Sequence, residues 1–157
     1  MKIGILQCDE VMPVFRPEFP DYPEMFERIL LAVNPNLTME VYRVIDGIHP
    51  ENIHTCDAYI FTGSRYSVYE DAPWIGAAKQ LVQRLHTHGK KMVGICFGHQ
   101  LIAEALGGKV VRSVNGWGIG VHTWEIRRNP GLNINDDRQF SLLVSHQDQV
   151  VQLPEHA

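Results

Sequence analysis

Between residues 1 and 106, short apolar runs alternate with longer stretches whose apolar residues lie three or four positions apart. The short runs have the length of buried strands, and the longer stretches have the spacing of helices. The predicted strands are Lys2 to Gln7, Thr38 to Ile45, Ala58 to Thr62 and Met92 to Ile95. Three helices are predicted. The first has Asp21 as its N-cap and carries apolar residues from Tyr22 to Val33; the others are Pro73 to Thr87 and about Gly98 to Leu106. This alternation predicts an α/β fold of three layers, with a mainly parallel sheet between helices.

The pattern changes after Lys109, where strands follow one another without helices between them. The predicted strands are Lys109 to Arg112, Gly120 to Arg127, Phe140 to Ser145 and Val150 to Leu153. The segment Asn129 to Asp137 is rich in Asn, Asp, Gly and Pro, which predicts a turn between two of them. We therefore expect an antiparallel β extension. With 157 residues, the chain is predicted to be a single domain, residues 1–157.

Composition narrows the classes of function. The formal net charge of -4 provides no basic face for nucleic acid or an anionic membrane, so neither is expected as a partner. No apolar run approaches the roughly 20 residues that span a bilayer, and we expect a cytoplasmic protein. The 3 cysteines are odd in number and lack metal-ligand spacing, which argues against a disulfide framework or a metal site.

The most informative segment runs from Gly94 through Cys96 and Gly98 to Gln100, directly after a predicted buried strand. A strand that turns sharply into a helix with a nucleophile at the turn needs small residues two positions to either side. Gly94 and Gly98 occupy those positions. The helix N-terminus stabilises a thiolate, and the amide of Phe97 is directed toward the oxyanion of a carbonyl under attack.

A simpler interpretation treats Cys96 as a small buried residue at an ordinary junction of strand and helix. Packing alone gives no reason for two flanking glycines, so we favour a nucleophile. Cys8 and Cys56 lie beside apolar strands without such a turn, and we expect both to be core residues.

The segment Gly94 to Leu101, Gly-Ile-Cys-Phe-Gly-His-Gln-Leu, resembles the nucleophile motif of class I glutamine amidotransferases, the family of the GMP synthase glutaminase domain. Phe61-Thr62-Gly63-Ser64 is similar to the segment that supplies the family's second oxyanion donor. Ser145 to Val150 is similar to the family's Ser-His-x-Asp-x-Val segment. Ser67 to Asp71 with Pro73-Trp74 resembles members that are not fused to a synthetase. The resemblance implies a flavodoxin-like fold.

The resemblance also implies a role for each matching residue. Cys96 would be the nucleophile, and the amides of Gly63 and Phe97 would be oxyanion donors. The glutamine-binding residues would be Gln100 and the backbone of Ser145, His146 and Gln147. The reaction would release ammonia from the side-chain amide of glutamine through a thioester, without a metal or other cofactor. The family passes the ammonia to a synthetase, which this chain does not contain, so the ammonia acceptor would be a separate synthetase or absent.

Two features depart from the family's pattern. The family completes its triad with a His-x-Glu element beyond the Ser-His-x-Asp segment, whereas Pro154-Glu155-His156 has the reverse order and comes too early. We therefore expect the chain to be truncated at its C-terminus, and inactive or nearly so by itself, because acid-base assistance is commonly worth a factor of about 10² to 10⁴. Arg65 also stands where many relatives have a second glycine, and it is expected to alter the substrate pocket.

Two alternatives to a glutaminase stay open. A γ-glutamyl peptide hydrolase uses the same turn and triad but releases a bulkier amine, and Arg65 with the loop to Trp74 would influence that choice. A binding or regulatory module without catalysis would keep the cysteine and lack the histidine and glutamate.

Overall fold

The computed structural model describes residues 1–126 and 139–155, which fall into two compact units. One unit holds Met1–Val111 with Val150–Ala157, and the other holds Arg112–Gln149. The turn that the sequence predicts at Asn129 to Asp137 lies outside the described residues. A single domain over residues 1–157 stays a prediction.

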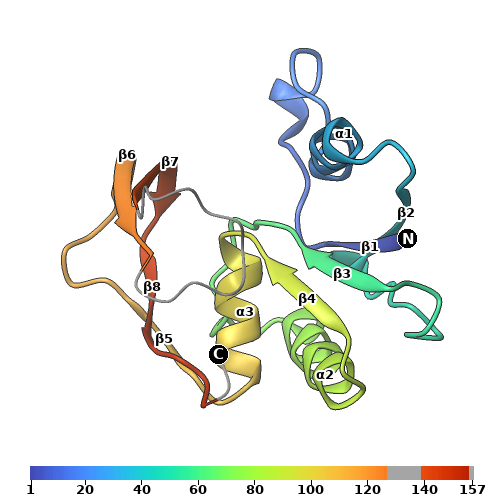
Figure 1. Ribbon diagram of the computed structural model, residues 1–157. Coiled ribbons are helices and arrows are strands. Elements are labelled where there is room, and N and C mark those ends of the chain that lie inside the picture. Colours follow the sequence, from blue (N-terminus) through green and yellow to red (C-terminus); the bar gives the residue numbers. More distant parts are fainter. Residues whose placement is uncertain (127–138, 156–157) are drawn as a thin grey trace. The chain divides into compact units, whose positions relative to one another are not determined.

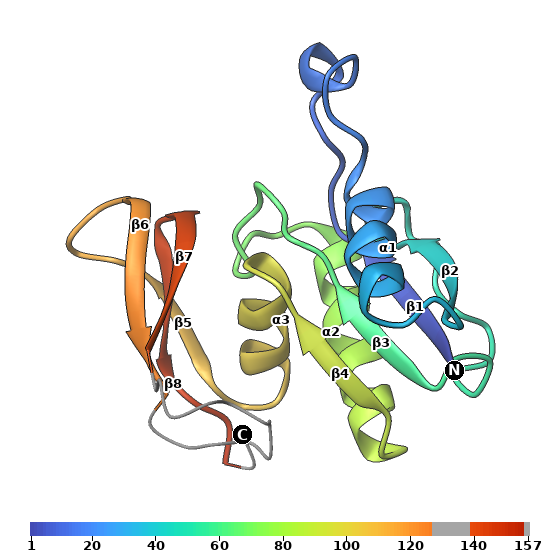
Figure 2. The ribbon, with the colours of Figure 1, turned by 45° about the horizontal axis from the view of Figure 1, so that its top comes forward.

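The first unit is built on a four-stranded parallel sheet with the strand order β2-β1-β3-β4. Its strands are β1 (Lys2–Gln7), β2 (Thr38–Arg43), β3 (Ala58–Phe61) and β4 (Lys91–Gly94). Its helices are α1 (Tyr22–Val33), α2 (Pro73–Thr87) and α3 (Phe97–Ala105), with a short turn of 3-10 helix, η1, at Pro13–Phe15. Figures 1 and 2 show α1 on one face of the sheet and α2 on the other. The predicted parallel sheet between helices is confirmed.

The main core lies between the sheet, α2 and α3. Its fully buried side chains include Leu6, Tyr59, Phe61, Val82, Leu85, Phe97 and Leu101. Helix α1 has an apolar stripe of Tyr22, Met25, Phe26, Ile29, Leu30 and Val33, but none of this helix's residues is buried. Ile29 and Val33 are 63% and 83% exposed. Helical spacing thus predicted the helix but not how much of its apolar face packs on the sheet.

The second predicted strand ends earlier than Ile45. Strand β2 stops at Arg43, and Val44–Asp46 form a 3-10 turn, η2. Gly47 closes this turn with a φ of 78°, and its N–H donates to the carbonyl of Val44 at 2.9 Å. A glycine adopts this left-handed conformation without a steric penalty, so the local turn outweighs the strand preference of Val44 and Ile45.

The predicted antiparallel strands are confirmed in the pair β6 (Gly118–Glu125) and β7 (Gln139–His146), in which Val121 lies opposite Leu143. Strands β5 (Lys109–Arg112) and β8 (Asp148–Gln152) form a further two-stranded sheet. Among the described residues, no helix is both long enough and apolar enough to cross a bilayer.

Candidate active site

Cys96 occupies the sharp turn between β4 and α3. Its backbone angles are φ 53° and ψ −110°, and within the described residues it is the one non-glycine residue with a positive φ. Such a conformation costs of order 1–3 kcal/mol and persists only where the surroundings enforce it. Cys96 is also the N-cap of α3, and its carbonyl accepts the N–H groups of His99 and Gln100. The predicted nucleophile turn is therefore present in the backbone.

The two flanking glycines are required by close backbone packing. A Cβ atom on Gly94 would lie closer than 3.0 Å to the carbonyl of Gly98 and to the nitrogen of His99. A Cβ atom on Gly98 would lie 2.5 Å from the carbonyl oxygen of Phe61. Backbone atoms cannot rotate away as the tip of a side chain can. The reason given for Gly94 and Gly98 from the sequence therefore agrees with the geometry.

The two residues expected to hold the oxyanion through their amides, Gly63 and Phe97, are both neighbours of Cys96. A Cβ atom on Gly63 would be 3.6 Å from Cβ of Cys96, so the loop after β3 touches the nucleophile. Phe97 begins α3, where an N–H group precedes the helical hydrogen-bond ladder. Among the residues that the structure describes, neither of these two N–H groups donates a hydrogen bond. Both are available to an oxygen atom beside Cys96.

A chain of aromatic rings supports this arrangement. The ring of Trp74 lies 5.5 Å from that of Phe97, and Tyr66 meets Trp74 edge to face at the same centroid distance. Phe97 is fully buried. Aromatic pairs at this spacing contribute about 0.5–1.5 kcal/mol beyond the area that they bury. The rings thus connect the loop after Gly63 to the first residue of α3.

Thr62 joins the end of β1 to the loop that carries Gly63. Its side chain is fully buried, and its hydroxyl accepts the N–H of Cys8 at 2.9 Å and donates to the carbonyl of Gly63 at 3.1 Å. These two bonds orient the peptide next to the candidate oxyanion donor.

Replacing Thr62 with valine is expected to lower the free energy of unfolding by about 1–3 kcal/mol, because it leaves the buried N–H of Cys8 without an acceptor. Urea denaturation would measure the change. Thr87→Val is the matched control, since the Thr87 hydroxyl is exposed and bonds only within its own helix; its effect is expected within about 0.5 kcal/mol. Equal effects of the two substitutions would contradict the role given to Thr62.

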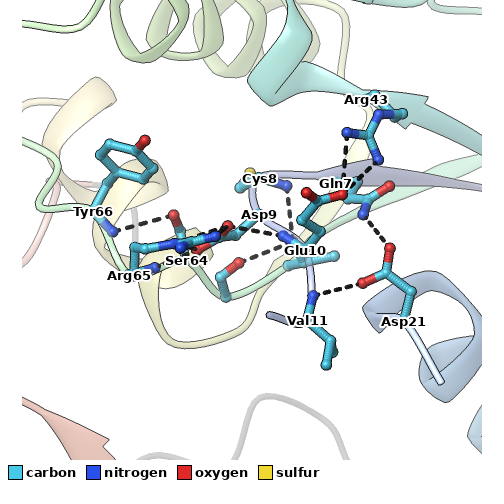
Figure 3. Close-up of polar contacts among 12 residues, drawn as sticks. Gln7, Cys8, Asp9, Glu10, Val11, Asp21, Arg43, Ser64, Arg65 and Tyr66 are labelled. Atoms are coloured by element: carbon cyan, nitrogen blue, oxygen red, sulfur yellow. Dashed lines mark hydrogen bonds and ion pairs between the residues drawn. The ribbon is translucent and has the colours of Figure 1, made fainter. Parts of the chain in front are cut away.

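Arg65 is held by Asp9, as Figure 3 shows. The Asp9 carboxylate, 2% exposed, accepts the backbone N–H of Arg65 at 2.8 Å, its Nε at 2.9 Å and its Nη2 at 2.7 Å. Burial opposes the charge of Asp9, but the hydrogen bonds from Arg65 outweigh it and lower the pKa of that carboxyl. These bonds fix the orientation of the guanidinium. The effect of Arg65 on the substrate pocket, expected from the sequence, stays a prediction.

The loop before α1 is held to the same edge of the sheet by Asp21. Its carboxylate, nearly buried, accepts Gln7 Nε2 and the N–H of Val11, each at 2.8 Å, and Arg16 Nη2 at 2.9 Å. Figure 3 includes the first two of these bonds. The N–H of Asp21 in turn donates to the Glu24 carboxylate at 3.1 Å, which is one half of a capping box. The predicted N-cap is present.

The residues expected to bind glutamine fall into both units. Gln100 lies on α3 one turn after Cys96 and is 3% exposed. Ser145 and His146 end β7 in the second unit, where His146 Nδ1 donates to the carbonyl of Asp148 at 2.9 Å. The carbonyl of Gln147 accepts the N–H of Ser113 at 3.0 Å. Their roles toward glutamine stay predictions.

The other two cysteines are core residues. Cys8 and Cys56 are fully buried, whereas Cys96 is partly exposed. Burial raises the pKa of Cys8 to about 12 and also raises that of Cys56. Across residues 1–126 and 139–155, no group of three or more His, Cys, Asp or Glu side chains could hold a metal ion. Cys96 is therefore the thiol best placed for chemistry.

Sequence reasoning missed three residues of this site: Asp9, Thr62 as a hydrogen-bonding group, and Trp74 as a ring beside Phe97. The available signal for Asp9 was its position, two residues beyond the buried strand β1. Ligand sites of parallel sheets lie beyond the carboxyl ends of the strands, so a polar residue there is a candidate. Nothing in the sequence near Thr62 or Trp74 indicated their contacts with Cys8 and Phe97.

Comparison with known proteins agrees with the motifs. Residues 26–157 match the family model described as glutamine amidotransferase class-I. Gamma-glutamyl peptidase 3 of Arabidopsis thaliana is 33% identical over 126 residues, which are 75% of this chain and 51% of that protein. A glutamine-hydrolyzing GMP synthase chain of Saccharolobus solfataricus is 35% identical over 104 residues, 66% of this chain and 53% of its own. The chain thus spans about half the length of these curated relatives.

Solved structures with a similar fold are also glutamine amidotransferases. A crystal structure of a glutamine amidotransferase from Thermotoga maritima superposes with a TM-score of 0.77 and 21% identity, covering 98% of this chain and 64% of that one. A second, from Methylobacillus flagellatus, gives a TM-score of 0.72 with 22% identity, over 99% of this chain and 57% of that one. The fold class expected from the sequence is confirmed.

Proposed function

Because the chain belongs to the class I glutamine amidotransferase family, we propose that it carries the nucleophile side of a site that cleaves γ-glutamyl amide bonds. The observation that carries this proposal is the strained turn at Cys96, with the amides of Gly63 and Phe97 beside it. Of the reactions open to a thiol at a helix N-terminus, attack on a carbonyl is the one that uses two adjacent N–H donors.

In the proposed reaction the Cys96 thiolate attacks the γ-carbonyl carbon, and a C–S bond forms. The amides of Gly63 and Phe97 stabilise the oxyanion, a contribution of roughly 3 kcal/mol per donor in hydrolases. The intermediate then collapses, the C–N bond breaks, and the amine leaves with one proton. Water attacks the thioester, releasing glutamate and restoring the thiol. In the family's pattern a His-x-Glu element beyond the Ser-His-x-Asp segment moves these protons, whereas the His-x-Glu triplet of these 157 residues, His49-Pro50-Glu51, precedes Cys96.

The substrate is proposed to be glutamine or a γ-glutamyl peptide, which share the glutamyl group and the bond that breaks. With glutamine the leaving group is ammonia, and a separate synthetase would take it up. The names of relatives support both: one is a gamma-glutamyl peptidase and another is a glutamine-hydrolyzing GMP synthase.

A glutamine-shaped chloroketone tests the proposal, because it places an electrophile where the side-chain amide would be. We expect it to alkylate Cys96 at least about 100-fold faster than a chloroketone of the same size without the α-amino and α-carboxylate groups, since binding orients the reacting atoms. Intact mass and peptide mapping would follow the reaction, and free glutamine should slow it.

The Cys96→Ala variant is the control and is expected to take up no label at the fast rate. Equal rates for the two chloroketones, or a fast reaction that glutamine does not slow, would contradict a γ-glutamyl site and favour a module without catalysis.

A further inference from the structure

Arg65 lies two residues beyond the candidate oxyanion donor Gly63, and its side chain is 56% exposed. Resting on the proposed function, we infer that Arg65 is a specificity residue that binds the carboxylate of the leaving group, so that the site prefers γ-glutamyl peptides to glutamine. The contacts of its guanidinium, its place relative to Cys96 and the chemistry of the two substrates carry this inference.

The guanidinium is already oriented before any substrate binds. Asp9 is 2% exposed and is bonded by the backbone N–H, Nε and Nη2 of Arg65. It also accepts the N–H of Glu10 at 2.8 Å, so the carboxylate itself cannot turn freely. A planar guanidinium clamped along one edge loses little conformational freedom when it binds a second carboxylate.

The clamp leaves donors unused. An arginine side chain has five N–H groups, and the bonds to Asp9 engage Nε and Nη2. Among the described residues, no hydrogen bond engages Nη1 of Arg65. Figure 3 shows Asp9 along one side of the guanidinium. The remaining N–H groups suit a carboxylate, because guanidinium and carboxylate form paired, charge-assisted hydrogen bonds.

Arg65 and the expected glutamyl-binding residue Gln100 follow different strands of the sheet. In the sheet order β2-β1-β3-β4, Cys96 follows β4, Arg65 follows β3 and Asp9 follows β1. Asp9 therefore draws the guanidinium to the β1 side of the loop, whereas Gln100 lies on α3, which follows β4 directly. A substrate held by the oxyanion donors can then place its glutamyl group toward α3 and its leaving group toward Arg65.

Tyr22, the first residue of α1, interacts electrostatically with the Asp9–Arg65 pair and with Cys96. Burial, and next the nearby Asp9 carboxylate, raise the pKa of Tyr22; Arg65 opposes this rise, and Cys96 adds to it. The charges of Asp9, Arg65 and Cys96 all act on this one phenol, in keeping with their places after the neighbouring strands β1, β3 and β4.

Leaving-group chemistry decides what such a cation would recognise. Hydrolysis of glutamine releases ammonia, which has no group for a guanidinium to bind. Hydrolysis of a γ-glutamyl peptide releases an amino acid or peptide that carries a carboxylate. A fixed arginine on the leaving-group side therefore favours the second class of substrate.

Protection of Cys96 against alkylation by iodoacetamide tests the inference without needing turnover. The three probes are γ-glutamylglycine, its C-terminal amide γ-glutamylglycinamide, and glutamine. For the unmodified chain we expect the free carboxylate to lower the half-protecting concentration about 10- to 100-fold relative to the amide, as charged hydrogen bonds do. In Arg65→Gln this ratio should fall to near one, while protection by glutamine stays unchanged.

Two further variants distinguish binding of the leaving-group carboxylate by Arg65 from the loss of any positive charge or of stability. Arg43→Gln removes a cation that pairs with Glu10 and Asp46 instead, and it should keep the ratio. Arg65→Lys keeps the charge without the planar fork, and it should lower the ratio in part even if Arg65→Gln fails to fold.

Equal protection by the peptide and its amide would overturn the inference while leaving the proposed function intact. So would an equal loss of glutamine protection in Arg65→Gln, because the arginine would then bind the glutamyl group. Failure of all three probes to protect Cys96 would overturn the proposed function itself, and the inference with it.

Discussion

Gly94→Ala is expected to lower the free energy of unfolding by about 3 kcal/mol or more. Overpacking a core usually costs about 1–3 kcal/mol, and the neighbours here are backbone atoms of Gly98 and His99 that no rotamer change can move. Relief would need α3 to shift away from β4, which would also displace the turn that holds Cys96. Urea denaturation would measure the loss, and the rate of Cys96 alkylation would report on the turn.

Gly76→Ala is the matched control for this substitution. Gly76 lies within α2, and an added Cβ would meet no heavy atom within 4 Å. Alanine in a helix is favoured over glycine by about 0.5–1 kcal/mol, so this variant should be as stable as the unmodified chain or more so. The two substitutions are thus expected to have opposite signs. A Gly94→Ala variant that behaved like Gly76→Ala would contradict the packing of the turn.

Alkylation of the native protein near pH 7 is expected to modify Cys96 at least about 10³-fold faster than Cys8. The thiolate is the reactive form, and burial raises the pKa of Cys8 to about 12. A thiol with the ordinary pKa of about 8.5 has about 10³ times more thiolate at that pH. Cys96 is also partly exposed, while Cys8 and Cys56 have no accessible surface. Timed alkylation with peptide mapping would give the three rates.

Controls assign the fast reaction to one thiol. Cys96→Ser should abolish it, and Cys8→Ala should leave it unchanged. In denaturant all three cysteines should react at similar rates, because the differences arise from the fold. A native Cys96 that reacted as slowly as Cys8 would remove the reason for placing the chemistry at this turn.

Much of this site was predictable because the turn is local. Gly94, Cys96 and Gly98 lie within five consecutive residues, and the contact that excludes a Cβ on Gly94 is with the backbone of Gly98 and His99 in the same turn. The candidate donor Phe97 followed from the turn and Gly63 from the family's motifs, and the structure brings the loop that carries Gly63 against Cys96. The glutamine-binding roles of Ser145, His146 and Gln147 rest on the motif alone.

What the amino-acid sequence determined by itself is therefore the order of strands and helices, the nucleophile turn and the family, since each depends on residues close together in the chain. Tertiary structure alone decided the rest. Asp9 meets Arg65 across 56 positions, and Thr62 meets Cys8 across 54. These pairs form because parallel strands bring their carboxyl ends to one edge of the sheet, and the choice of neighbouring strands depends on packing of the whole core. The same packing left Ile29 and Val33 of α1 exposed.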